Sequence, residues 1–175
     1  MRSMFGAPCL ATLLLTAPIA AWADGTGGIF KHTVAAWSSD KPLNFLYAPY
    51  TKHFSKSEFH EYVWLVGLEK ESPGNALIGA TFFSNSFGQP STYIYPFGGV
   101  YRNVLDINGL FVKWSAGLIY GYLEPFNNKV PFNNNGFSPG FIPAVGYQSQ
   151  NFSAQINILN DAGLMLQLNW PLPGR

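Results

Sequence analysis

The sequence predicts an all-β fold, an eight-stranded antiparallel transmembrane β-barrel preceded by a short amphipathic α-helix. The first observation behind this prediction is composition, since only 11% of the 175 residues are charged while 47% are hydrophobic and 17% aromatic. In soluble domains about a quarter of the residues are charged. The second is periodicity, because polar and apolar residues alternate from residue 43 onward. Membrane barrels alternate in this way, with lipid-facing and lumen-facing side chains.

Residues 1–23 have the pattern of an export signal. Arg2 precedes an apolar run, Leu10–Ala20, that is shorter than the roughly 20 residues needed to span a bilayer. Ala21-Trp22-Ala23 then offers the small-x-small pattern of a cleavage site. The sole cysteine, Cys9, lies in this segment, so the mature chain is expected to have no disulfide, thiolate metal ligand or thiol nucleophile. No basic block is present, so nucleic acid is not an expected partner.

Residues 24–42 are predicted to form an N-terminal amphipathic helix. Ile29, Phe30, Val34 and Trp37 recur at about one helical turn, and a polar stretch then ends the segment. Such an apolar stripe can lie on a membrane surface; the alternative is an ordinary cap over a soluble core.

Residues 43–175 are predicted to form the barrel, from eight strand-like runs separated by turn signals. The runs are Leu43–Phe54, His60–Glu69, Ala76–Ser86, Ser91–Asn103, Leu110–Tyr122, Phe137–Gln148, Phe152–Leu159 and Gly163–Trp170. In the last two runs apolar residues alternate with amides and hydroxyls, as a narrow hydrated or ligand-filled lumen requires. A closed sheet is expected because lipid leaves no partner for an unpaired strand edge.

Two prolines interrupt the sixth run. Pro139 and Pro143 cannot donate ladder hydrogen bonds. They mark either a bulge or a weak point in the wall through which a lipid chain could pass.

Four residues near the ends of the first three runs are candidates for chemistry. If the hairpins run up and down, His53, His60 and Ser86 reach the same rim, with Asn85 beside the serine. Acyl transfer needs an activated hydroxyl and a base within hydrogen-bond reach, and histidine is the natural base near neutral pH. The alternative interpretation is that these side chains only solvate the rim.

Other charged residues fit weaker hypotheses. The histidines with Glu58 or Glu61 match no metal-binding spacing, so no metal is expected. Arg102, Lys113 and Lys129 either face lipid phosphates or are ordinary solvated charges.

Several short segments resemble the lipid A palmitoyltransferase (PagP-like) family of eight-stranded outer-membrane barrels. They are Phe30–Trp37, Leu46–Pro49 with His53, Phe83–Phe87, Ile142–Tyr147 and Phe152–Gln155, which together span nearly the whole mature chain. The resemblance implies a protein in the outer membrane of a Gram-negative bacterium, which moves a palmitoyl chain from a phospholipid to lipid A. It implies no cofactor, a monomer, and the barrel assembly machinery and membrane lipids as partners.

The family's catalytic residues can be carried over position by position. The resemblance makes His53, or less directly His60, the family's histidine and Ser86 its serine. Asn85 stands where the family has an aspartate, and an amide brings no negative charge to an imidazolium. Catalysis by the family's route therefore needs a substitute carboxylate, for which Glu58 and Glu61 are the nearby candidates.

A looser likeness supports a second hypothesis. Asn85–Ser91 with His53 and His60 is similar to small bacterial barrel proteins labelled as possible glycerol-3-phosphate transporters. The alternative function is thus a non-catalytic outer-membrane barrel that binds lipid or passes a small solute. Eight strands leave an interior barely wider than its own side chains, which argues against an open porin. A purely structural barrel is the third hypothesis.

Overall fold

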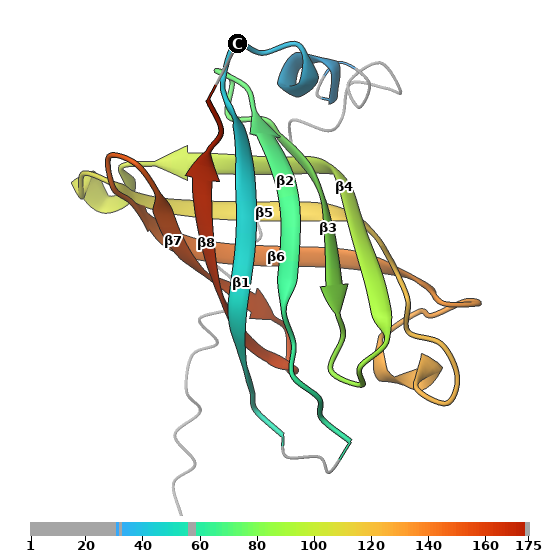
Figure 1. Cartoon of the computed structure of the whole chain (residues 1–175). Helices are drawn as coiled ribbons and strands as arrows, with labels where there is room; N and C mark the ends of the chain where they lie inside the picture. Colours follow the sequence, from blue (N-terminus) through green and yellow to red (C-terminus); the bar gives the residue numbers. More distant parts are fainter. Residues whose placement is uncertain (1–30, 32, 56–58, 174–175) are drawn as a thin grey trace, which may run out of the picture.

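The computed structural model describes residues 31, 33–55 and 59–173, and its fold is a closed antiparallel barrel (Figure 1). Each strand pairs with the next, and β1 pairs with β8 to close the sheet. The predicted all-β, eight-stranded antiparallel barrel is therefore confirmed. The strands are β1 (Leu43–His53), β2 (Leu65–Glu71), β3 (Leu77–Ser84), β4 (Pro90–Arg102), β5 (Leu110–Tyr120), β6 (Phe137–Gln148), β7 (Ser153–Leu159) and β8 (Gly163–Pro171).

Alternation along the strands sorts side chains between lumen and exterior. On β1, Leu46 and Ala48 are buried inside, whereas Phe45 and Tyr47 are exposed on the outer wall. A shift of one residue would reverse every one of these positions, so the apolar outer face and the mixed inner face fix the register.

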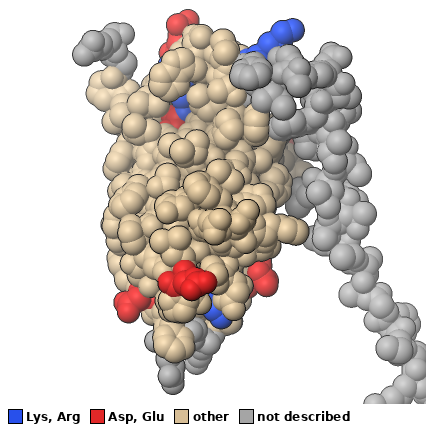
Figure 2. Space-filling model, turned by 90° about the vertical axis from the view of Figure 1, so that its right-hand side faces the viewer, with Lys and Arg blue, Asp and Glu red and all other residues tan. Residues whose placement is uncertain are grey.

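The barrel has two ends of different character. The helix end carries the short helix and the β2–β3, β4–β5 and β6–β7 connections, and the loop end carries the other four. The face in Figure 2 shows a broad band without charged side chains, with charged groups near both ends. Exposed apolar side chains on the strands include Phe45, Leu68, Phe82, Ile94, Leu118, Phe141, Val145 and Ile158.

A short helical segment, residues 33–37, packs on the outer wall at the helix end (Figure 1). Ala36 is fully buried and clusters with Ala76 and Ile78. The Thr33 hydroxyl donates a hydrogen bond to the carbonyl of Pro96 at 3.1 Å. The rest of the predicted helix, residues 24–30 and 32, lies outside the described residues, as does the predicted export signal. Among the described residues no helix is long and apolar enough to cross a membrane.

β2 begins five residues later than predicted, at Leu65 instead of His60. β1 pairs with β2 only as far as Ala48, and its pairing with β8 shifts register between Tyr47 and Tyr50, on either side of Pro49. Proline cannot donate to a ladder, so pairing with β2 stops there. Residues 60–64 run instead beside the end of β3, where the Ser84 N–H donates to the Trp64 carbonyl at 3.1 Å.

Candidate functional site

His53 and Ser86 meet at the loop end. His53 is the last residue of β1, and Ser86 lies in the turn between β3 and β4. Nε2 of His53 is 2.7 Å from Oγ of Ser86, within hydrogen-bond distance. A histidine nitrogen this close to a hydroxyl can accept its proton, which is the first requirement for using the serine as a nucleophile.

Asn85 builds the turn that presents Ser86. Its side chain is fully buried, and its Oδ1 accepts hydrogen bonds from the backbone N–H groups of Phe87 at 2.9 Å and Gln89 at 3.1 Å. Its Nδ2 donates to the Ser91 hydroxyl at 3.1 Å and to the Gly121 carbonyl at 3.3 Å. The amide thus acts on Ser86 through the backbone.

His60 lies against His53. The two ring centroids are 4.3 Å apart, with the planes inclined at 34°. The edge of His60 meets Phe87, whose ring centroid is 5.8 Å away. His53 is thus the imidazole within hydrogen-bond distance of Ser86, while His60 contacts the ring of His53.

His60 is the charged group that affects His53, and no carboxylate of the described residues forms an ion pair with His53. His53 is the last residue of β1, at the loop end. Burial first, and then the positive charge of His60, lower the pKa of the His53 imidazole below its ordinary value of 6.5. Among the described residues the ion pairs are Glu71–Arg102 and Glu69–Lys113, neither of which involves His53.

Of the two candidate carboxylates, Glu61 is described and Glu58 is not. The Glu61 backbone N–H donates to the Ser86 carbonyl at 2.8 Å, so this residue fixes the position of the serine through the main chain. Its side chain is exposed and lies beside Gly88. No cluster of three or more metal-ligating side chains occurs in the described part of the chain.

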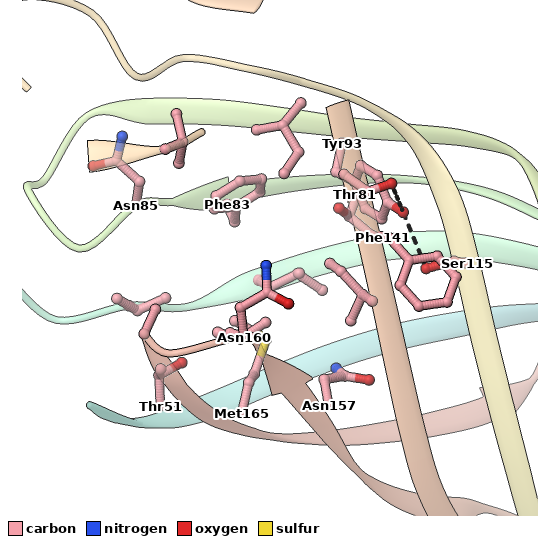
Figure 3. Close-up of a pocket in the computed structure, with 18 of the residues that line it drawn as sticks. Thr51, Thr81, Phe83, Asn85, Tyr93, Ser115, Phe141, Asn157, Asn160 and Met165 are labelled. Atoms are coloured by element: carbon pink, nitrogen blue, oxygen red, sulfur yellow. Dashed lines mark hydrogen bonds between the residues drawn. The ribbon is translucent and has the colours of Figure 1, made fainter. Parts of the chain in front are cut away.

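His53 and Ser86 line a largely apolar cavity. Figure 3 shows other residues of its lining, among them Asn85, Phe83 and Met165. This loop-end chamber has a volume of about 190 Å³. Its apolar wall includes Val63, Leu65, Phe83, Ile119, Ile142, Leu159 and Met165. Deeper in the lumen, the Tyr93 hydroxyl donates to Ser115 Oγ at 3.1 Å (Figure 3). The cavity therefore offers an apolar space that ends on polar groups.

The barrel wall beside the chamber is weakly paired between β6 and β7. These strands pair only over Ala144–Gln148 and Ser153–Asn157, so residues 137–143 of β6 have β5 as their ladder partner. Phe141 is 53% exposed on the outside and also lines the chamber. Pro139 and Pro143 lie in this stretch, which pairs with β5 but not with β7, so their missing N–H groups are tolerated on the β7 side.

A buried ion pair separates this chamber from a second one at the helix end. Nζ of Lys113 is 2.7 and 2.8 Å from the two carboxylate oxygens of Glu69, and the Tyr95 hydroxyl donates to one of them at 2.9 Å. The helix-end chamber has a volume of about 210 Å³, and Glu69, Lys113 and Gln155 line both cavities. We call these three residues the septum.

Beside the septum, four amides form a closed ring of hydrogen bonds on β7 and β8. Gln155 donates to Asn157 at 2.6 Å, Asn157 to Gln167 at 2.8 Å, Gln167 to Asn169 at 2.6 Å, and Asn169 back to Gln155 at 3.0 Å. We call these residues the amide ring. The alternation of amides with apolar residues in the sequence had indicated a polar lumen face here, and all four side chains are buried.

Sequence reasoning missed the septum. Lys113 was a candidate for lipid phosphates or open solvent, and that expectation is wrong because the residue is only 8% exposed and pairs with Glu69 inside the lumen. The sequence does contain a pattern that indicates an inward-facing lysine, because the apolar residues Val112 and Trp114 flank Lys113. Because Val112 and Trp114 lie on the outer side of β5, Lys113 between them faces the lumen.

No protein-family profile and no curated protein matches this chain. Five chains among solved structures match it. One is a protein of unknown function from Clostridium acetobutylicum, with 10% sequence identity over 75% of this chain and 97% of that chain, and a TM-score of 0.19. A TM-score this low supports no argument about fold or function, so the proposals below rest on this chain's own residues.

Proposed function

We propose that this protein is an outer-membrane acyltransferase that moves an acyl chain from a phospholipid to lipid A, or to water in a hydrolytic variant. The observation that carries the proposal is the 2.7 Å contact between His53 Nε2 and Ser86 Oγ at the mouth of an apolar chamber. The resemblance to the lipid A palmitoyltransferase family supports the choice of donor and acceptor.

Membrane residence is supported by the outer surface. The sheet closes between β1 and β8, and closure is the way in which a sheet protects its edges in lipid. Large apolar side chains such as Phe82, Ile94 and Leu118 are about half exposed on the outer wall. A surface of this kind is stable in lipid and costly in water.

The first half-reaction uses His53 as base. Nε2 takes the proton of the Ser86 hydroxyl while Oγ attacks the ester carbonyl carbon of the phospholipid. The ester C–O bond breaks, the lysophospholipid oxygen leaves with the proton from His53, and the acyl chain is then bound to Oγ. The chain lies in the loop-end chamber, against side chains such as Leu65 and Ile142.

The second half-reaction reverses these roles. A hydroxyl of lipid A, or water, loses its proton to His53 and attacks the acyl carbonyl. The bond to Oγ of Ser86 breaks, and Oγ regains the proton from His53. Both steps need His53 in its neutral form at the start, which is the form that burial favours.

The weak pairing between β6 and β7 supports a lateral route for the lipid. A phospholipid in the outer leaflet could pass its chain beside Phe141 without leaving the membrane, because Phe141 lines the chamber and is exposed on the outer wall. The stretch of β6 that does not pair with β7 holds both prolines, which limits how tightly the gap can close.

The test is mass spectrometry of lipid A and phospholipids from cells that express the full chain or its Ser86→Ala variant. We expect an added acyl mass on lipid A, or lysophospholipid and free fatty acid, that disappears with the serine. Ser55→Ala, which removes an exposed hydroxyl at the same rim, is the matched control and should change nothing. Identical lipid pools with the protein and with Ser86→Ala would rule out the catalytic proposal.

The second candidate function is a non-catalytic lipid-binding barrel. It is favoured by Asn85, whose amide is committed to the turn, and by the absence of an ion-paired carboxylate at His53 among the described residues. Phospholipid that co-purifies with both the protein and Ser86→Ala, without turnover in either, would support this function.

A further inference from the structure

His53 needs a partner that holds its ring, and among the described residues no carboxylate forms an ion pair with it. A base at a strand end can rotate about its side-chain bonds, and a base that is displaced by about 1 Å loses much of its effect. Carboxylates commonly fix this orientation in His–Ser sites. The described residues place His60 on the ring of His53 instead, at 4.3 Å between centroids.

His60 is itself held by an aromatic column that joins three loops. Phe87 of the β3–β4 turn meets the edge of His60, and it stacks on Phe126 of the β5–β6 loop at 4.2 Å with planes only 11° apart. Phe59, next to His60 in the chain, packs on Phe126 at 6.2 Å. We use the name aromatic column for Phe59, Phe87 and Phe126. Offset-stacked and edge-to-face aromatic pairs are favourable arrangements, so these contacts stabilise the position of His60.

The charges around His53 come from every element at the loop end. Lys52 precedes it on β1, Lys129 of the β5–β6 loop and Asp161 of the β7–β8 turn line the same chamber, and Glu61 follows His60. None of these forms an ion pair with His53 among the described residues. His60 is the charged neighbour whose effect on the His53 imidazole stands out.

We propose that His60, braced by the aromatic column, is a positioning residue that holds the His53 imidazole against Ser86 in place of a carboxylate. This inference rests on the proposed acyltransferase function, which it extends to a residue that touches only the base. The ring contact supplies orientation. The charge of His60 adds a second effect, because a protonated neighbour opposes protonation of His53 and so preserves the base in mildly acidic medium.

Two variants of the full chain separate these effects. His60→Phe keeps a ring against His53 and removes the charge, whereas His60→Ala removes both. Turnover of dipalmitoylphosphatidylcholine in mixed micelles is followed from pH 5 to 9. We expect His60→Phe to retain kcat at high pH and to move the acidic limb of kcat/KM to higher pH, because loss of the nearby charge raises the pKa of His53. His60→Ala should lower kcat at every pH roughly tenfold or more, with KM little changed.

A second readout does not depend on turnover. The His53 imidazole is titrated by NMR in ¹⁵N-histidine-labelled protein and in His60→Phe, both in micelles. A higher pKa of His53 in His60→Phe supports the proposed contact, and an unchanged pKa overturns it. Full activity of His60→Ala would overturn it equally. If no form turns over lipid while the titration still shifts, the acyltransferase proposal fails and the coupling of the two histidines stands.

Discussion

The Asn85 side-chain nitrogen faces three oxygens. They are the Gly121 carbonyl, the side-chain oxygen of Gln89 at 3.3 Å, and the hydroxyl of Ser91, whose own proton is donated to the Gln89 carbonyl at 3.2 Å. A carboxylate at this position would place another acceptor against these oxygens, in a place fully shielded from water. The turn therefore requires the amide of Asn85. The aspartate that the lipid A palmitoyltransferase family has at this position would not supply the donor that these oxygens need.

Asn85→Asp is accordingly predicted to destabilise the protein, even though it creates the residue that the family has. Leaving the Gly121 carbonyl without its donor should cost about 1–3 kcal/mol, and more if the carboxylate stays ionised. Unfolding by urea in micelles, followed by tryptophan fluorescence, measures the loss. Asn151→Asp, at an exposed turn position, is the control. Equal stabilities of the two variants would contradict this account of the turn.

The meeting of His53 and Ser86 was predictable from the sequence, because an up-and-down order of strands is enough to bring both to one rim. The role of Asn85 was not, since its partner Gly121 lies 36 positions away and is recognised only by its carbonyl. The contact of His60 with His53 was also out of reach, because it depends on where β2 begins and on Phe126 from a distant loop.

At the scale of elements, β7 and β8 carry a device that fixes their register through side chains. The backbone ladder aligns Ser153–Leu159 with Gly163–Asn169, and the amide ring closes across the same two strands. Each amide both donates and accepts within the ring. A slip of one residue would turn all four amides to the outer wall and would break the hydrogen bonds of the ring.

Gln155→Leu tests this device. The change removes the donor to Asn157 and the acceptor for Asn169, and a buried polar group left unpaired costs about 1–3 kcal/mol. We therefore predict a lower midpoint of urea unfolding. Gln150→Leu, an exposed position in the β6–β7 connection, should leave the midpoint within experimental error. If the two variants unfold alike, the ring does not contribute to stability.

The strands themselves were largely predictable, because period-two alternation and turn residues mark them locally. The start of β2 was not. His60–Trp64 alternates well enough to look like a strand, yet Pro49 on the neighbouring strand ends the ladder before those residues can join it. Whether two strands pair depends on the sequences of both. Here the residue that ends the pairing of β2, Pro49, lies on β1.

At the scale of the whole molecule, the barrel exposes its apolar residues on the outer wall and places its charges inside or at the ends. Exposed Leu118 and Ile94 lie on the outer wall, whereas Glu69 and Lys113 are buried in the lumen. A protein that folds in water is expected to bury its apolar residues and to expose its charged ones. A barrel with an apolar exterior needs few charged residues, and the low charged fraction of the sequence therefore predicts a membrane barrel.

Leu118→Arg is predicted to weaken folding into phosphatidylcholine vesicles by about 2–4 kcal/mol, the cost of an arginine at the middle of a lipid-facing strand. The comparison is Tyr101→Arg, an exposed outer position near the helix end of β4, where the cost should fall to about 0–1 kcal/mol. Urea titrations of folding into vesicles measure both. Equal costs would show that the outer wall does not lie in hydrocarbon.

The septum divides the lumen, and this division has a consequence for a barrel that lies in a membrane. Glu69, Lys113 and Gln155 line both chambers, so they divide the lumen into two cavities. The loop-end chamber is mostly apolar, and the helix-end chamber is polar. An acyl chain that fills the loop-end chamber would contact the charged side chains of the septum at its inner end. A polar molecule in the helix-end chamber would contact the same side chains from the opposite side. In the membrane location that we propose, this division would let the barrel hold a site at one end without forming a continuous pore between its two ends.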